Sequence, residues 1–342
     1  MTAQRGPELP NPMHLVEEFR AFQRTMALRA ALEMDLFTRI GSGADTISTL
    51  AEQSGASQRG LRILCDFLTV QGHLVKRDGR YSLPLHSQLY LTTTSAAYIG
   101  SAVRFLASDA MVQSFCGLRR AVEFGGGRGS GPATPATLPG DSQWVEFAQA
   151  LGPLAKRVAP LAAAALAVTP DEPLQVLDIA AGHGFYGLAV AARNPAAHIF
   201  ALDGPQVLEV AERNARLAGV SERYHRIPGD AFQVEFGGPY DLVLMANFAH
   251  HFDAATNTAL FRKCRGVLKA SGRMAVLDFI TNDDRVSPPD DAAFALTMLA
   301  TTARGDVYTF REFSGMLEAA GFRDVRRLDG DDLSRWIIVA SG

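Results

Sequence analysis

The second half of the chain alternates short apolar runs with helical stretches, and this alternation restricts the possible folds more than any other feature. The runs are LQVLDIA (174–180), HIFALD (198–203), RYHRIPGD (223–230), YDLVLMA (240–246), GRMAVLDFI (272–280) and RWIIVA (335–340). A further helix is expected near 309–320. Strands that alternate with helices form βαβ units, in which helices cover both faces of a mostly parallel sheet. We therefore predict an α/β domain over residues 169–342.

The first part of the chain has a different pattern. Residues 13–40 carry apolar side chains at steps of three and four, which predicts one long amphipathic helix. Two more helices are expected at 46–55 and 57–72, the second with Ser57 and Gly72 at its ends. Residues 73–83 then read as two strands joined at Asp78-Gly79, a typical hairpin turn. This order predicts a winged helix-turn-helix within a domain of residues 1–95.

A middle segment, residues 96–168, is expected to connect the two domains. Helices are predicted at 96–124 and 142–168, with the Gly/Pro-rich stretch 125–141 as a loop.

Composition restricts the setting in which the protein works. The formal net charge of the 342 residues is -3, so no strong field attracts nucleic acid or anionic lipid. Cys65, Cys116 and Cys264 form no CxxC pair, which fits a reducing compartment. The first residues lack the apolar core of a signal peptide, and no run approaches the length of about 20 apolar residues that spans a bilayer. We expect a soluble, cytoplasmic protein without a membrane partner.

The stretch VLDIAAGHGFYGLAV (176–190) is the most informative motif. A buried strand ends near Asp178, a turn containing Gly182 and Gly184 follows, and a helix begins. Glycine is suited to such a turn because a Cβ atom would hold the backbone away from a ligand at the helix N-terminus. Dinucleotide-binding dehydrogenases share this arrangement, so the motif alone indicates only a nucleotide-like ligand.

Three further strand ends strengthen the case for a nucleoside cofactor. Asp203 ends the second strand about 20 residues beyond the loop, where a carboxylate can accept both ribose hydroxyls. Asp230, Ala231 and Phe232 follow the third strand, where an adenine would lie against apolar side chains. The fourth strand then leads NFAHHFD into the edge of the sheet where open α/β folds bind ligands.

With these motifs, residues 172–342 resemble a class I S-adenosylmethionine-dependent methyltransferase. The whole chain resembles the plant and bacterial small-molecule O-methyltransferases whose helical N-terminal domain dimerises. The resemblance implies a Rossmann-like domain with a mostly parallel seven-stranded sheet, preceded by an all-α winged-helix dimerisation domain. It also implies a homodimer, S-adenosyl-L-methionine as cofactor, S-adenosyl-L-homocysteine as product and a small-molecule acceptor.

The same resemblance assigns residues to the cofactor. Asp178, Gly182 and Gly184 would line the methionine side, Asp203 and Gly204 the ribose, Asp230, Ala231 and Phe232 the adenine, and Asn247 the lip of the pocket beside Ala246. Ala180 stands in the cofactor loop where the family usually has glycine. An alanine fits there if its φ is negative, which we expect.

His250 matches the histidine that acts as general base in the O-methylating relatives, a role suited to a pKa near neutrality. The alternative is a pocket-lining or structural histidine. Asp278 matches the first of the two acidic residues that hold the base, whereas the second falls at Val307, next to Asp306. His251 is expected in a supporting or surface position.

The acceptor pocket is expected between residues 290–303, 105–116 and 142–157. Its candidate walls are apolar or aromatic, which indicates a flat, largely apolar acceptor: Phe294, Met298, Met111, Phe115, Trp144 and Phe147. The sequence has no acidic cluster like the metal site of catechol-type methyltransferases, so we expect a metal-free mechanism.

Three alternatives remain at this point. The first is methyl transfer to carbon or nitrogen, and the second is cofactor binding diverted to chemistry other than methylation. The third is a DNA-binding regulator, which the sequence disfavours. The helix 57–72 is apolar around most of its circumference, and basic and acidic residues nearly balance in 14–86.

Overall fold

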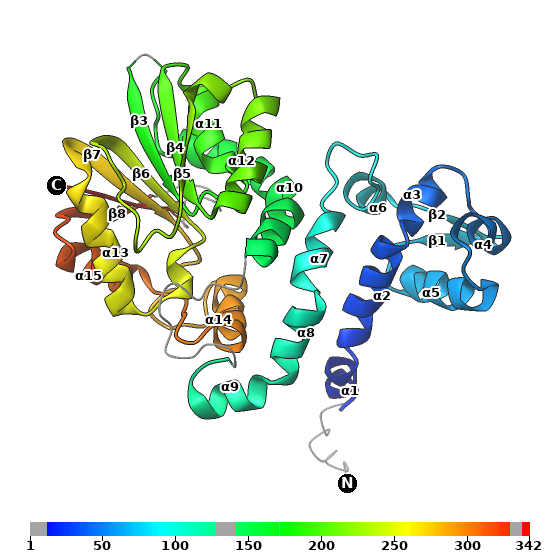
Figure 1. Ribbon diagram of the computed structural model, residues 1–342. Coiled ribbons are helices and arrows are strands. Elements are labelled where there is room, and N and C mark those ends of the chain that lie inside the picture. The colour runs from blue at the N-terminus through cyan, green and yellow to red at the C-terminus, as the bar shows by residue number, and fades with distance from the viewer. Residues whose placement is uncertain (1–11, 128–140, 171, 329–336) are drawn as a thin grey trace, which may run out of the picture. The chain divides into compact units, whose positions relative to one another are not determined.

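The computed structural model describes residues 12–127, 141–170, 172–328 and 337–342 (Figure 1). The chain divides between Ala107 and Ser108 into two compact units. Helices of the middle segment occur in both units, and the three-part division 1–95, 96–168 and 169–342 stays a prediction.

The first unit is helical with one small hairpin. Its elements are α1 (Met13–Phe19), α2 (Phe22–Glu33), α3 (Leu36–Gly41), α4 (Ile47–Ser54), α5 (Gln58–Val70), β1 (Val75–Arg77), β2 (Arg80–Ser82), α6 (Leu85–Tyr90), a 3₁₀ turn (Gly100–Ala102) and α7 (Val103–Leu106). Buried side chains from α3, α4, α5 and the hairpin form one core, among them Phe37, Leu50, Leu68 and Tyr81.

The predicted helix start and hairpin turn are confirmed. The Ser57 hydroxyl accepts a hydrogen bond from the Gly60 N–H at 3.1 Å, which caps α5. Asp78 and Gly79 have φ values of 50° and 75°. Two successive residues in the left-handed region define the tight turn that suits the twist of a two-residue hairpin.

The single helix predicted over 13–40 is wrong, since the chain leaves helical geometry twice. It breaks between α1 and α2, and again at Asp35, whose φ is 53°. The second break re-aims the chain, so that Leu36, Phe37 and Ile40 of α3 enter the core. The helix predicted over 96–124 is likewise several short ones: the 3₁₀ turn, α7, α8 (Asp109–Cys116) and α9 (Leu118–Phe124).

The second unit contains a seven-stranded sheet. Besides α8 and α9 its helices are α10 (Asp141–Ala165), α11 (Phe185–Arg193), α12 (Pro205–Leu217), α13 (Ala254–Gly266), α14 (Pro289–Thr301) and α15 (Phe310–Ala319). Its strands are β3 (Leu174–Ile179), β4 (Ala197–Asp203), β5 (Tyr224–Pro228), β6 (Tyr240–Ala246), β7 (Leu268–Leu277), β8 (Asp324–Arg327) and β9 (Ile337–Ser341).

The strand order is β5-β4-β3-β6-β7-β9-β8, and β9 alone runs in the direction opposite to the other six strands. The mostly parallel seven-stranded sheet inferred from the resemblance is thus confirmed. Strand β8 was not among the runs read from the sequence, because its four residues, DVRR, include three charged ones.

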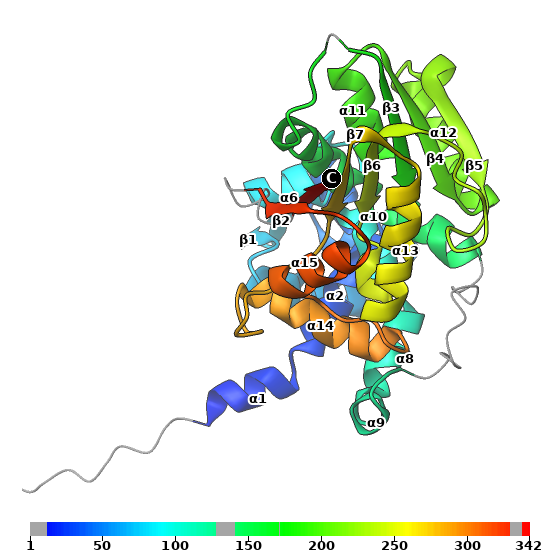
Figure 2. The ribbon, with the colours of Figure 1, turned by 90° about the vertical axis from the view of Figure 1, so that its left-hand side faces the viewer.

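Helices cover both faces of the sheet, as Figures 1 and 2 show. Alternate residues of β6 enter different cores, as the two-residue period of a strand requires. Val243 and Met245 pack in the core that contains α13 and α15. Leu242 and Leu244 pack in the core that contains α10, α11 and α12.

This arrangement brings the segments after β3 to β7 to one edge of the sheet, because parallel strands end on the same side. Among the described residues, no helix combines the length and apolar character needed to traverse a bilayer.

Candidate active site

Asp178 lies one residue before the end of β3 and is buried. Its carboxylate accepts a hydrogen bond from the Gly187 N–H of α11 at 3.2 Å. A Cβ atom on Gly187 would lie 2.8 Å from this carboxylate, so glycine permits the close approach of α11 to the strand. Burial raises the pKa of Asp178 to about 7, with a smaller contribution from Asp203, while the Gly187 hydrogen bond opposes the shift.

The turn after β3 departs from expectation at Ala180. Its φ is 54°, in the left-handed region, so the prediction of a negative φ is wrong. Two hydrogen bonds explain the turn: the Ala181 N–H donates to the Leu202 carbonyl at 3.1 Å, and the Gly182 N–H donates to Asp203 at 2.8 Å. Both draw the loop toward the end of β4. An alanine in this conformation costs about 1–2 kcal/mol.

Asp203 joins the loop to the start of α12. One carboxylate oxygen accepts from Gly182, and the other accepts from the Gly204 N–H at 2.7 Å. The predicted ribose residues and the glycine loop are therefore brought together at one point of the sheet edge. Gly184, with a φ of 78°, has no room for a side chain either, since a Cβ would lie 2.8 Å from the Tyr224 hydroxyl.

Asp230 has one carboxylate oxygen that no described residue contacts by a hydrogen bond. Its Oδ1 accepts a hydrogen bond from the Phe232 N–H at 2.9 Å, whereas Oδ2 is buried and has no hydrogen bond within the described part of the chain. The Phe232 ring meets the Phe252 ring edge to face at 4.9 Å, and Ala231 is buried beside it. A buried acceptor next to aromatic rings fits an amino group on a flat heterocycle. The residues present therefore fit an adenosine.

His250 and Asp278 form a buried pair, with exposed fractions of 4% and 2%. The ring Nδ1 of His250 lies 2.5 Å from Oδ1 of Asp278. The carboxylate also accepts the backbone N–H groups of His250 at 3.2 Å and Phe279 at 2.8 Å. Because a carboxylate only accepts hydrogen bonds, Nδ1 holds the proton and Nε2 keeps a lone pair. This Nε2 has no hydrogen-bond partner among the residues that the structure describes.

The carboxylate of Asp306 does not take the place of the second acidic residue, which falls at Val307 in this chain. Val307 is buried, and the Asp306 carboxylate lies 3.5 Å from the Arg285 guanidinium. Only the backbone of Asp306 reaches the base, since its N–H donates to the His250 carbonyl at 3.0 Å. Asp278 is thus the one carboxylate that contacts His250 in the described ranges.

Aromatic rings surround the base. Phe294 of α14 meets the His250 ring edge to face at 5.0 Å and stacks on Phe279 at 3.9 Å. The predicted wall residue Trp144 lies edge to face with His251 at 5.4 Å and with Phe147 at 5.6 Å. The structure therefore places Phe294 near His250 and Trp144 near His251, with Phe147 behind Trp144.

His251 lies directly beside the candidate base, closer than the supporting or surface position expected from the sequence. Its ring lies 4.3 Å from the His250 ring, and burial together with the neighbouring His250 lowers its pKa well below the ordinary value. A neutral imidazole therefore adjoins the base at physiological pH.

Tyr186 was not identified from the sequence. Its hydroxyl accepts a hydrogen bond from Nδ2 of Asn247 at 3.4 Å, and Asn247 itself has a φ of 52°. A partly buried aromatic residue on a helix is usually read as core, and the sequence separation of 61 between the two residues hides the contact.

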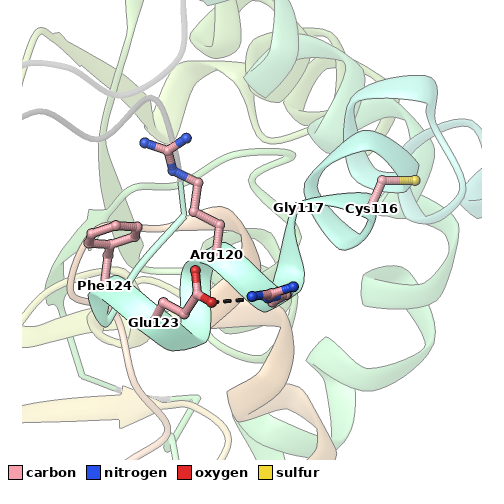
Figure 3. A pocket seen from close by; sticks show the side chains of 6 residues that line it. Cys116, Gly117, Arg120, Glu123 and Phe124 are labelled. Atoms are coloured by element: carbon pink, nitrogen blue, oxygen red, sulfur yellow. Dashed lines mark hydrogen bonds and ion pairs between the residues drawn. The ribbon is translucent and has the colours of Figure 1, made fainter.

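A hollow lies elsewhere, on the turn between α8 and α9 (Figure 3). It is lined by Cys116, Gly117, Arg119, Arg120, Glu123 and Phe124. Arg119 pairs with Glu123 at 3.0 Å, and both are exposed. None of the predicted site residues lines this hollow.

Comparisons with known proteins agree with the geometry. The model of the O-methyltransferase domain matches residues 162–323, and that of the O-methyltransferase dimerisation domain matches residues 16–93. The 3-hydroxy-5-methyl-1-naphthoate 3-O-methyltransferase of Streptomyces sahachiroi is 26% identical over 326 residues, which cover 94% of this chain and 92% of that protein.

Solved structures share the whole fold. A protein from Nostoc punctiforme PCC 73102, an O-methyltransferase by assignment, is 42% identical with a TM-score of 0.90, over 98% of this chain and 100% of that one. Human N-acetylserotonin methyltransferase in complex with S-adenosylmethionine has a TM-score of 0.82 at 22% identity, over 98% of this chain and 99% of that one. The chain belongs to the family of S-adenosylmethionine-dependent small-molecule O-methyltransferases that carry an N-terminal dimerisation domain.

Proposed function

We propose that this methyltransferase methylates a hydroxyl group of a small aromatic, polyketide-like acceptor, with His250 as the general base. The observation that carries the proposal is the hydrogen bond between Nδ1 of His250 and Asp278, which leaves Nε2 with a free lone pair beside the cofactor loop's edge of the sheet.

The seat proposed for S-adenosylmethionine follows the sheet edge. Asp178, Ala180, Gly182 and Gly184 would bind the methionine end, and Asp203 and Gly204 the ribose. Asp230, Ala231 and Phe232 would enclose the adenine, with Asn247 at the lip. The unpaired Oδ2 of Asp230 supports this placement, because the adenine amine would satisfy it.

S-adenosylmethionine, when bound, would supply an electrophilic methyl group to the acceptor oxygen, and its sulfur would keep the electron pair of the carbon–sulfur bond. Nε2 of His250 takes the proton of the acceptor hydroxyl as that oxygen becomes methylated. Asp278 stabilises the imidazolium that forms. General base catalysis of this kind contributes about 10²–10⁴-fold, and alignment of the reactants contributes more.

The aromatic side chains near His250 and His251 indicate the class of acceptor. Phe279, Phe294 and Trp144 offer ring surfaces around the two histidines, which suit a flat aromatic molecule. The naphthoate acted on by the Streptomyces sahachiroi relative belongs to this class. We also propose a homodimer, supported by the match to the dimerisation domain, and a cytoplasmic location, supported by three free cysteines.

The substitution His250→Ala tests the base. We expect turnover of a neutral phenol to fall by at least about 100-fold, while the affinity for S-adenosylmethionine, measured by calorimetry, stays within about twofold. His86→Ala, which changes an exposed histidine of the first unit, is the matched control and should retain full turnover. A loss below about tenfold in a folded variant would contradict the base assignment and favour an acidic carbon as the methylated atom.

A further inference from the structure

Tyr186 contacts the residue that follows β6, the strand that separates the two halves of the site. In the sheet, β6 lies between β3 and β7. Asp178 lies near the end of β3 on the cofactor side, and Asp278 follows β7 on the side of the base. The residue after β6 is Asn247, and its side chain donates its hydrogen bond to the Tyr186 hydroxyl.

The charges of both carboxylates act on the Tyr186 hydroxyl. Burial raises the pKa of Tyr186, and the charges of Asp178 and Asp278 both raise it further, whereas the Asn247 hydrogen bond opposes the shift. The phenol therefore stays protonated at physiological pH. Its oxygen has a second lone pair, and Asn247 is its only hydrogen-bond partner among the described residues.

The transferring methyl group must cross this same space. The methionine end of the donor is proposed to lie against Asp178 and the glycine loop, and the acceptor oxygen must lie near Nε2 of His250. An in-line displacement places the methyl carbon between them. With the donor so placed, the Tyr186 hydroxyl at the end of β6 would lie close to the reacting carbon.

We infer that the Tyr186 hydroxyl oxygen contacts the sulfonium methyl group and orients it toward the acceptor through a weak C–H···O hydrogen bond. A methyl on a sulfonium is polarised, so its hydrogens are better donors than those of a neutral alkyl group. S-adenosylhomocysteine has neither this methyl group nor the positive charge on sulfur. Tyr186 consequently favours the methylated donor over the demethylated product, which aids product release.

Calorimetry with Tyr186→Phe tests the inference, which rests on the proposed placement of the donor. The wild type should bind S-adenosylmethionine, and the variant should bind it about two- to fivefold more weakly, the effect of one weak hydrogen bond. Its affinity for S-adenosylhomocysteine should not change. An equal change for both ligands, or no change for either, would overturn the role of Tyr186. Failure of the wild type to bind either ligand would instead refute the donor placement.

Tyr224→Phe is the matched control. Tyr224 carries a buried hydroxyl next to Gly184 of the same loop. Burial and the charges of Asp178 and Asp203 raise its pKa, whereas Asp278 does not contribute. Any effect of this substitution should be the same for the two ligands, because they share the adenosine. A change in their ratio equal to that of Tyr186→Phe would count against a specific methyl contact.

The wild-type protein provides a readout without substitution. S-adenosylmethionine labelled with ¹³C in its methyl group should show a downfield proton shift of that methyl on binding, as a C–H···O contact produces. Tyr186→Phe should move the signal back toward the free value. An unshifted methyl signal in the wild-type complex would overturn the inference.

Discussion

At the scale of single residues, Asp178 couples the cofactor site to pH. Its pKa of about 7 lies far above the ordinary value of 3.8. The folded protein therefore keeps a proton between about pH 4 and pH 7 that the unfolded chain has lost. Without ligand, this group contributes stability at low pH, and the contribution is lost as the pH rises through 7.

Without ligand, Asp178 favours its protonated form. A bound donor favours the ionised form instead, because its ammonium group is positively charged. We expect S-adenosylmethionine to bind more tightly as the pH rises from 5 to 7, with release of up to one proton near pH 6. Calorimetry in buffers of different ionisation enthalpy measures this release. Asp178→Asn should remove both the proton release and the pH dependence. Proton-neutral binding by the wild type at pH 6 would exclude the coupling.

Ala180 stores backbone strain in the cofactor loop. Replacement by glycine relieves about 1–2 kcal/mol at φ 54°, partly offset by about 0.4–1 kcal/mol from the more flexible unfolded chain. Ala180→Gly should therefore raise the free energy of unfolding by up to about 1.6 kcal/mol in a denaturant titration. Ala181→Gly, at a neighbour without positive φ, should lower it. A destabilised Ala180→Gly protein would show that the alanine is not strained.

That the motif residues gather at one edge of the sheet could be predicted from the sequence, whereas the contact between Tyr186 and Asn247 could not. Asp178 and Asp203 lie at or near the ends of their strands, and Asp230 and His250 follow theirs, so the alternation of strands and helices brings all four to one edge of the sheet. Tyr186 meets Asn247 only through the packing of α11 against the sheet edge, and no spacing in the sequence reveals such a contact.

At the scale of elements, apolar periodicity predicted where helices occur but not where they break. The three- and four-residue steps continue through 13–40, and neither break contains glycine or proline to mark it. Asp35 instead takes the left-handed conformation, and tertiary packing stabilises this choice by burying Leu36 and Phe37 of α3. Propensity and spacing carry no record of that packing.

The segment between α14 and α15 secures the base through Gly305. A Cβ atom there would lie 2.4 Å from the His250 carbonyl oxygen, and the next residue donates its N–H to that same oxygen. Gly305→Ala should displace His250 and lower kcat by about tenfold to 100-fold, since small misplacements of reacting groups have such effects. Donor affinity should persist in calorimetry.

Gly315→Ala is the control for this change. Gly315 lies in α15 with open space around it, so alanine should leave kcat unchanged and slightly stabilise the helix. If Gly305→Ala retained wild-type kcat, the loop would not be what holds the base.

At the scale of the whole molecule, the first unit presents apolar side chains that a monomer leaves in water. Met13, Leu15, Phe19 and Phe22 are 53%, 49%, 74% and 65% exposed. Burial of such side chains against a second copy would stabilise by about 25 cal/mol per Å² of apolar surface, and contiguous exposed patches of this kind are typical of interfaces. The match to the dimerisation domain over residues 16–93 includes both phenylalanines.

We therefore expect a dimer of twice the 36.8 kDa chain mass in sedimentation analysis at micromolar concentration. The double substitution Phe19→Glu and Phe22→Glu should raise the dimer dissociation constant by at least about 100-fold, because each charge must lose water at the interface. Leu217→Glu, at a side chain 83% exposed in the second unit, should leave the dimer intact. A double variant that remains dimeric would mean that α1 and the start of α2 lie outside the interface, and that the copies associate through other surfaces.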